Sequence, residues 1–99
     1  MNSKLLSIIG LCKKSGNLSV GFDSCIESVN QKNSKLILIT KDLSERTLNK
    51  LSVQLNNKVP TCFINYAMED IRQIVGKTSG IISINNDGFA EKIKQLLNT

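Results

Sequence analysis

The sequence predicts an α/β domain in which a β-sheet carries helices on both of its faces. Apolar residues alternate between helical spacing and short strand-like runs along the chain. The run from Leu36 to Ile39 is continuously apolar, which is typical of a strand buried on both faces. The segments that connect these patterns are short. Together these observations favour a sheet that is largely parallel, with helices as the connections between strands.

The first half of the chain is predicted to alternate helix and strand twice. Each helix is recognised by apolar residues three and four positions apart, and each strand by a short apolar run. The predicted elements are a helix with its apolar face from Leu5 to Cys12 that ends at Gly16, a strand from Leu18 to Val20, a helix from Phe22 to Val29, and a strand from Leu36 to Thr40.

The second half continues the same alternation and adds three local signals. Asp42 and Glu45 have capping-box spacing, so Asp42 is the predicted N-cap of the next helix. Gly76 is a predicted left-handed C-cap, and residues 85–88 are turn and cap residues. The predicted elements are a helix with its apolar stripe from Leu48 to Leu55, a strand from Thr61 to Ile64, a helix from Met68 to Val75, a strand from Gly80 to Ile84, and a helix from Phe89 to Leu97.

Length and composition limit the class of protein. The chain has 99 residues, and because two independent cores would need roughly 100 residues each, residues 1–99 are predicted to form one domain. The longest apolar run is Leu36 to Ile39, far shorter than the roughly 20 residues of a membrane span. No secretory signal is apparent and the three cysteines are far apart. We therefore expect a cytoplasmic protein with reduced thiols.

The sequence contains no motif of an enzyme. It has no His, which removes the commonest general base and metal ligand. Gly76-Lys77-Thr78 matches the end of a P-loop, but the earlier glycine is missing and a strand follows instead of a helix. We predict no catalytic residue, cofactor or metal. An enzyme that uses Cys25 or Cys62 is a minor alternative, since both cysteines fall on apolar patterns typical of buried residues.

The excess of basic residues is the more informative feature. Thirteen Lys and Arg oppose eight Asp and Glu, a net charge of +5 that suits a polyanion but also an ordinary solvated surface. Gly21 opens a helix directly after a strand, where free N–H groups favour phosphate, although a tight turn without a ligand is equally consistent. Phe22 is either the first core residue of that helix or a surface aromatic beside a ligand. The few aromatic residues argue against a base-stacking platform.

Five segments together form a recognisable pattern that spans nearly the whole chain. They are Ile9 to Leu18, Val20 to Phe22, Lys35 to Ile39, Asp42 to Thr47, and Asp87 to Ala90. In this order and spacing the chain resembles the bacterial YlxQ-like proteins of the kink-turn RNA-binding ribosomal-protein superfamily (L7Ae/L30e type). The resemblance implies a three-layer α/β/α sandwich with a four-stranded mixed sheet. It also implies a non-enzymatic protein that binds structured RNA, such as ribosomal RNA or a messenger RNA leader, with the ribosome or other proteins as further candidate partners and no membrane or small-molecule substrate.

The resemblance also implies where RNA would bind. The contacts would come from the turn into the second helix and from the loop between the fourth helix and the fourth strand. Gly21 would allow close approach of the backbone, Ser24 and the helix N-terminus would donate hydrogen bonds, and Lys41 and Lys77 would neutralise phosphates. The complete expected set is Gly21, Phe22, Asp23, Ser24, Lys41, Gly76, Lys77, Thr78 and Ser79.

The second helix departs from the pattern of the family's kink-turn binders at four positions. Asp23 and Ser24 stand where those proteins carry Asn and Glu, and Glu27 and Gln31 stand where they carry basic residues. A good base contact contributes roughly 1–3 kcal/mol of discrimination, so these changes act against tight kink-turn recognition. The alternative function is a protein-interaction adaptor on the same fold.

Overall fold

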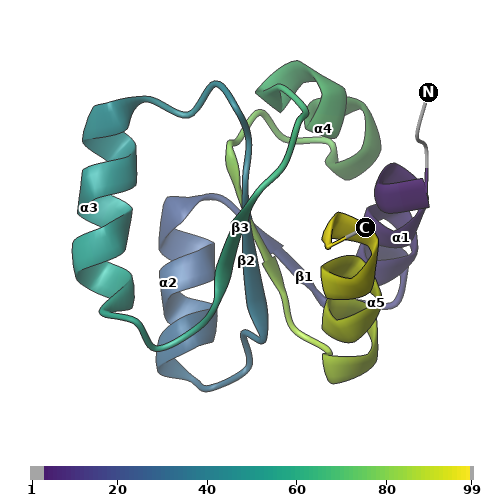
Figure 1. The fold of residues 1–99 in the computed structure, drawn as a ribbon, viewed down its shortest axis with the longest axis horizontal. Coiled ribbons are helices and arrows are strands. Elements are labelled where there is room, and N and C mark those ends of the chain that lie inside the picture. Colours follow the sequence, from purple (N-terminus) through teal and green to yellow (C-terminus); the bar gives the residue numbers. More distant parts are fainter. Residues whose placement is uncertain (1–3, 99) are drawn as a thin grey trace.

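The chain folds into three layers, with a central sheet between two layers of helices (Figure 1). The structure is a computed structural model that describes residues 4–98. Its elements are α1 (Lys4–Lys14), β1 (Leu18–Val20), α2 (Phe22–Asn30), β2 (Leu36–Ile39), α3 (Glu45–Leu55), β3 (Thr61–Phe63), α4 (Met68–Val75), β4 (Ile81–Ile84) and α5 (Asp87–Leu97). The predicted order of elements and the predicted α/β/α sandwich are confirmed. Within residues 4–98, every helix is too short or too polar to cross a membrane.

The sheet is mixed, with strand order β1-β4-β2-β3. β2 and β3 are parallel, whereas β4 lies between β1 and β2 and is antiparallel to both. The expectation of a largely parallel sheet, drawn from the alternation of helices and strands, is therefore wrong. Alternation of helices and strands shows only that a helix separates two strands, and it does not give the direction of the second strand. Here α4 lies at the end of the sheet where β3 finishes, so the chain enters β4 from that same end (Figure 1).

The four residues of β2 divide the core between the two faces of the sheet. Leu36 and Leu38 pack with buried residues of α1, α4 and α5, and Ile37 and Ile39 pack with those of α2 and α3. All four side chains are buried, as the continuous apolar run predicts. Burial on both faces follows from the direction of successive side chains in a strand, which alternates from one face to the other.

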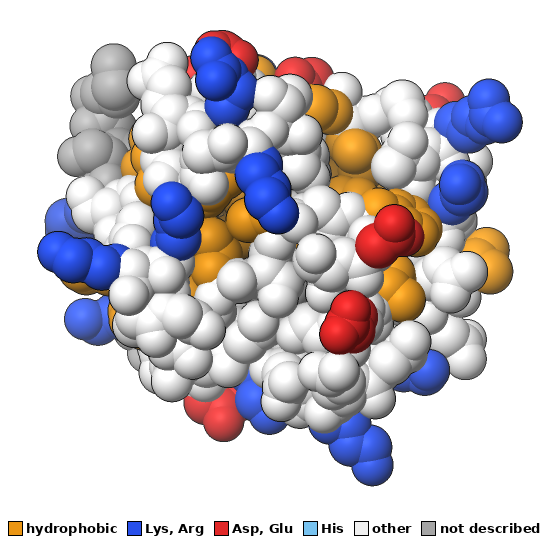
Figure 2. Space-filling model, turned by 180° about the vertical axis from the view of Figure 1, so that it is seen from behind, with side chains coloured by type: hydrophobic (Ala, Val, Ile, Leu, Met, Phe, Trp, Pro, Cys, Tyr) orange, Lys and Arg blue, Asp and Glu red, His pale blue; other side chains and the backbone are white. Residues whose placement is uncertain are grey.

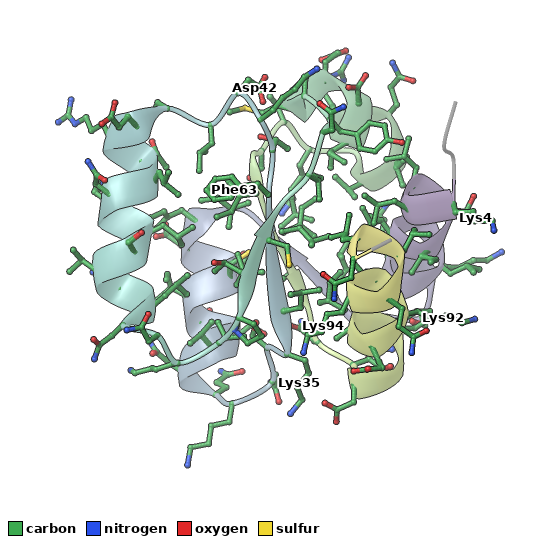
Figure 3. The ribbon with its side chains drawn as sticks, in the orientation of Figure 1. Lys4, Lys35, Asp42, Phe63, Lys92 and Lys94 are labelled. Carbon is green, nitrogen blue, oxygen red and sulfur yellow. The ribbon has the colours of Figure 1, made fainter. Side chains whose placement is uncertain are left out.

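The helix caps confirm two predictions and correct one. Gly76 is the left-handed C-cap of α4, with φ 79°, and the Asn86 side chain caps the N-terminus of α5. The predicted Asp42 cap of α3 is wrong, because α3 begins later and Ser44 is its N-cap. The Asp42 carboxylate instead accepts a hydrogen bond from the Met68 N–H, at 3.0 Å, and so caps the start of α4. Asp42 is the third residue after β2, which places it beside α4 before the chain turns into α3 (Figure 3).

A hydrogen-bond network fixes α2 to the sheet. The Asn85 side-chain oxygen accepts from the hydroxyls of Ser28 (2.7 Å) and Ser83 (2.6 Å). The Asn85 amide donates to the Ser19 hydroxyl at 2.9 Å, and the Ser83 and Ser34 hydroxyls lie 2.7 Å apart. Burying a polar group without a hydrogen-bond partner costs free energy. These hydrogen bonds therefore allow polar side chains to be buried between α2, β1 and β4.

Candidate functional site

The predicted site residues gather at one end of the sheet. β1 and β2 finish at this end and β4 begins there, as their pairing registers show. The segment after β1 contains Gly21, the segment after β2 contains Lys41, and residues 76–80 lead into β4. We call the surface formed by residues 21–24, Lys41 and residues 76–79 the rim. The mixed topology thus brings together three segments that are far apart in the sequence.

The first part of the rim is the N-terminus of α2. Gly21 has φ 103°, a backbone conformation that favours glycine. Its N–H donates to the Ile81 carbonyl and its carbonyl accepts from the Cys25 N–H, both at 3.0 Å. No side chain of the described chain caps α2. The first N–H groups of α2 are therefore open donors, and Ser24 exposes its hydroxyl beside them.

The charge of α2 differs between its tip and its exposed face. Asp23 lies exposed in the first turn, where a carboxylate stabilises the helix but also competes for the positive end of its dipole. One turn further along, the Glu27 carboxylate accepts from the Gln31 amide at 3.3 Å. Figure 2 shows two acidic side chains near the middle of this face of the molecule, on the half that α2 occupies, with basic side chains spread around them.

The loop between α4 and β4 forms the second part of the rim. After the Gly76 cap, Lys77 and Thr78 are exposed. Ser79 is half-buried, and its side chain bonds to the β4 backbone as donor (3.3 Å) and as acceptor (3.2 Å). The Gly80 carbonyl accepts a hydrogen bond from the residue that follows β2, at 3.0 Å. Hydrogen bonds thus fix the C-terminal end of the loop, at Ser79 and Gly80. Lys77 lies exposed in the part of the loop before these residues.

The third part of the rim is the segment that leaves β2. Lys41 is exposed, and its N–H donates to the Tyr66 carbonyl at 3.0 Å. Thr40 is 1% exposed, and its hydroxyl has no hydrogen-bond partner in the described part of the chain. A Cβ atom added to Gly80 would lie only 2.6 Å from the Thr40 Oγ1 atom. Glycine is therefore required at position 80, a role that sequence reasoning did not find.

Phe22 takes the first of the two roles that the sequence left open, that of a core residue at the start of α2. Its side chain is half-buried and packs against the core cluster between the sheet, α2 and α3. The Lys50 ammonium lies 5.6 Å from the centroid of the Phe22 ring, a cation–π distance that brings a further cation close to the start of α2.

Sequence reasoning missed a polar hollow beside α2. Its volume is about 230 Å³. The lining comes from β1, α2, the segment after α2 and the residue after β4, so no continuous motif marks it. The residues that line it are Ser19, Ser24, Glu27, Ser28, Gln31, Asn33 and Asn85. A serine within an apolar run, Ser19 between Leu18 and Val20, was the available signal.

The cysteines do not provide an activated nucleophile. Cys25 and Cys12 are fully buried, and burial raises the pKa of Cys25 to about 12 and that of Cys12 to about 11. An exposed Cys25 at a helix end, as the enzyme alternative requires, is therefore wrong. Cys62 is half-buried and packs against the cluster on the α1, α4 and α5 side. Residues 4–98 contain no group of three or more His, Cys, Asp or Glu side chains that could hold a metal ion.

The fold and the sequence together define the class of protein. Residues 3–94 match the Ribosomal protein L7Ae/L30e/S12e/Gadd45 family, and the chain belongs to this family. Within it, the chain is YlxQ-like. It is 29% identical over 94 residues to the RNA-binding protein YlxQ of Enterococcus faecium, covering 95% of this chain and 91% of that protein. It is 28% identical over 96 residues to the RNA-binding protein YlxQ of Bacillus subtilis, covering 91% of each.

Solved structures confirm the fold. A protein of unknown function from Bacillus halodurans superposes with a TM-score of 0.85 at 21% sequence identity, over 99% of this chain and 100% of that one. The Giardia lamblia 15.5 kD RNA binding protein superposes with a TM-score of 0.75 at 17% identity, over 99% of this chain and 88% of that one. The likeness therefore extends over the whole sandwich.

Proposed function

We propose that this chain is a small, non-enzymatic RNA-binding protein of ribosomal-protein type that acts in the cytoplasm. The observation that carries the proposal is the convergence at the rim of an uncapped helix N-terminus and two exposed lysines, Lys41 and Lys77. The names of the YlxQ relatives and of the Giardia lamblia protein support the same partner.

The proposed mechanism is recognition of RNA shape through its phosphates. The open N–H groups after Gly21 and the Ser24 hydroxyl donate hydrogen bonds to phosphate oxygens. Lys41 and Lys77 neutralise further phosphates and release their counterions. Phosphate contacts do not read the base sequence. The protein would therefore select RNA by shape, because only a kinked helix brings phosphates to separate parts of the rim at once.

The other predicted residues shape the rim. Gly76 turns the chain so that the loop can project, and Ser79 fixes the end of that loop on β4. Thr78 offers an exposed hydroxyl beside Lys77. Phe22 anchors the start of α2 in the core, and Asp23 weakens the attraction for phosphate there.

Fluorescence anisotropy with two labelled RNAs tests the proposal. We expect a kink-turn RNA to bind the full chain more tightly than a plain duplex of the same length, because only the kinked helix reaches all parts of the rim. If neither RNA binds better than millimolar at low salt, the proposed function is wrong. If both bind equally, the shape-dependent mechanism is wrong and only non-specific binding is left.

A charge reversal at Lys77 locates the contact. We expect Lys77→Glu to weaken binding and to flatten the plot of log affinity against log salt by about one unit. Lys92→Glu makes the same change on α5, away from the rim, and is the matched control (Figure 3). An equal loss in both variants would show that only net charge matters and would remove Lys77 from the site.

The carboxylates of α2 favour a second candidate function, that of a protein-interaction adaptor. Asp23 and Glu27 place two negative charges on an exposed helix face next to the rim. In the adaptor case, the full chain binds neither RNA, and a pull-down from extract treated with nuclease still retains a protein partner. Loss of the partner on nuclease treatment would instead support RNA as the direct ligand.

A further inference from the structure

The outer edge of β3 is an unpaired strand edge. β3 is the last strand in the sheet order, so in the part of the chain that the structure describes it has a neighbouring strand on one side only. Just after β3, the Ile64 N–H donates to the Ile39 carbonyl of β2 at 2.8 Å. Backbone groups of successive residues in a strand point to opposite sides. The N–H and C=O groups of Thr61 and Phe63 therefore point away from the sheet.

The same edge exposes an aromatic ring. Phe63 is 63% exposed and belongs to neither of the two core clusters. Its pairing with Ile39 places the ring on the sheet face that carries α2 and α3, and Figure 3 shows it projecting from β3 on that side. Thr61 is exposed on the same face. Natural sheet edges rarely combine free backbone groups with an exposed aromatic side chain, because such an edge invites pairing.

We propose that the β3 edge binds an extended, net-acidic segment of a protein partner, which adds to the sheet as a fifth strand. Thr61 and Phe63 each present an N–H donor and a C=O acceptor, and a peptide backbone complements both along its length. The phosphate groups of a nucleic acid offer acceptors only, so phosphate contacts alone leave the outward carbonyls unpaired. An apolar side chain of the added strand covers the Phe63 ring, since side chains on one face of adjacent strands are in contact.

The net positive charge of α3 and of the segment before β3 favours an acidic partner. Lys58 lies just before the strand, and α3 exposes Arg46 and Lys50 against the single carboxylate of Glu45. With a net charge of +5, two copies of the chain repel each other, which disfavours pairing of β3 with a second copy. Two features limit pairing at this edge, the three-residue length of β3 and the proline at position 60 directly before it.

The proposed edge lies across the sheet from the α2 part of the rim. Gly21 follows β1 at one edge of the sheet and Phe63 lies at the other, with β4 and β2 between them. At a strand spacing of about 4.8 Å, the two edges are about 14 Å apart, whereas Lys41 follows β2 and lies nearer to β3. A peptide on β3 therefore leaves the N-terminus of α2 open, and the inference does not depend on the proposed RNA function.

Titration of the isotope-labelled full chain with a defined peptide tests the inference. The probe is a capped heptapeptide that alternates glutamate and valine around a central phenylalanine. We expect shifts of the Thr61 and Phe63 amide resonances with this peptide, and not with a version carrying lysine for glutamate. A version with methylated backbone nitrogens at alternate residues should also fail, because its donors towards β3 are blocked.

Three variants keep the test independent of peptide design. Thr61→Pro removes an outward N–H without removing a bond to β2, and Phe63→Ser removes the ring. Each should weaken peptide binding about three- to tenfold and leave binding of RNA unchanged. Val53→Ser removes an apolar side chain that is 77% exposed on α3 and is the matched control, with no expected effect.

Four outcomes would overturn the inference. They are the absence of shifts at millimolar acidic peptide, equal shifts with the lysine peptide, shifts of β3 on raising the protein concentration alone, and shifts of the same amides with single-stranded oligouridylate. The third outcome would identify a second copy as the occupant, and the fourth would identify an extension of an RNA surface. Loss of RNA binding with intact peptide binding would contradict only the proposed function.

Discussion

Replacing Gly80 by Ala tests the packing that holds the rim together. The added Cβ would lie 2.6 Å from the Thr40 Oγ1 atom and 2.9 Å from the Leu43 Cδ1 atom. Leu43 can rotate, but Thr40 is buried at the end of β2, so the backbone must shift. Overpacking of this kind costs about 1–3 kcal/mol. For a domain of this size, we expect Gly80→Ala to lower the Tm by about 5–20 °C.

Thermal and urea unfolding followed by circular dichroism measure the effect. Gly10→Ala is the matched control, because a Cβ at Gly10 has its nearest contact at 3.6 Å, with the Ile74 Cγ2 atom. Gly10 lies inside α1, where Ala is more stable than Gly by about 0.5–1 kcal/mol. The same substitution should therefore raise stability at position 10 and lower it at position 80.

A double variant identifies the cause. Thr40→Ala removes the Oγ1 atom that the new Cβ would meet, so adding Gly80→Ala to it should cost less free energy than adding Gly80→Ala to the wild type. Contacting residues typically show such a coupling, of about 0.5–3 kcal/mol. An additive double variant, or a Gly80→Ala protein as stable as the wild type, would refute the close approach of Gly80 and Thr40.

Three further predictions concern the rest of the fold. Asn85→Ala removes the hydrogen-bond partner of the buried Ser28 hydroxyl and should lower the free energy of unfolding by about 1–3 kcal/mol in urea titrations, and an unchanged midpoint would contradict the network. Asp42→Ala removes the cap of α4 and should cost about 1 kcal/mol, which Asp42→Asn should partly restore. Because burial raises the thiol pKa to about 11 in Cys12 and about 12 in Cys25, unfolded thiols ionise above about pH 9 while folded ones stay protonated. Stability should then fall as pH rises from about 9 to 11, by roughly 1 kcal/mol per pH unit for each thiol, and less steeply in Cys25→Ala.

The elements of the fold could be predicted because each depends on local patterns. The apolar run of β2, the Gly76 cap and the Asn86 cap all follow from residues that are close in sequence. The direction of β4 does not follow from local patterns, because it depends on the end of the sheet from which the chain returns; the mixed sheet that the family resemblance implied is confirmed. Asp42 was assigned to the wrong helix for a related reason, since its partner, Met68, is 26 residues away.

Local signals mark the proposed site residues one by one, but they do not show that these residues lie on one surface. Gly21, Lys41 and Lys77 each follow a recognisable signal, a strand-to-helix turn or a cation at the end of an element. Their convergence depends on β4 running antiparallel between β1 and β2, which no local pattern contains. The unpaired hydroxyl of Thr40 and the network around Asn85 likewise exist only once distant segments are packed together.

The opposing charges of α2 limit how RNA can lie on the proposed surface. A phosphate at the open tip of the helix meets the N–H donors, with Lys41 and Lys77 on neighbouring segments, whereas a phosphate further along meets Glu27. Because interactions between exposed charges weaken over about 8–10 Å, a phosphate interacts most strongly with the charges nearest to it. A kinked RNA that leaves the helix after its first turn avoids the carboxylate, but a straight duplex lying along α2 does not. Glu27→Lys should therefore raise affinity for the duplex more than for the kinked RNA, and an equal gain for both would show that RNA does not follow α2 at all.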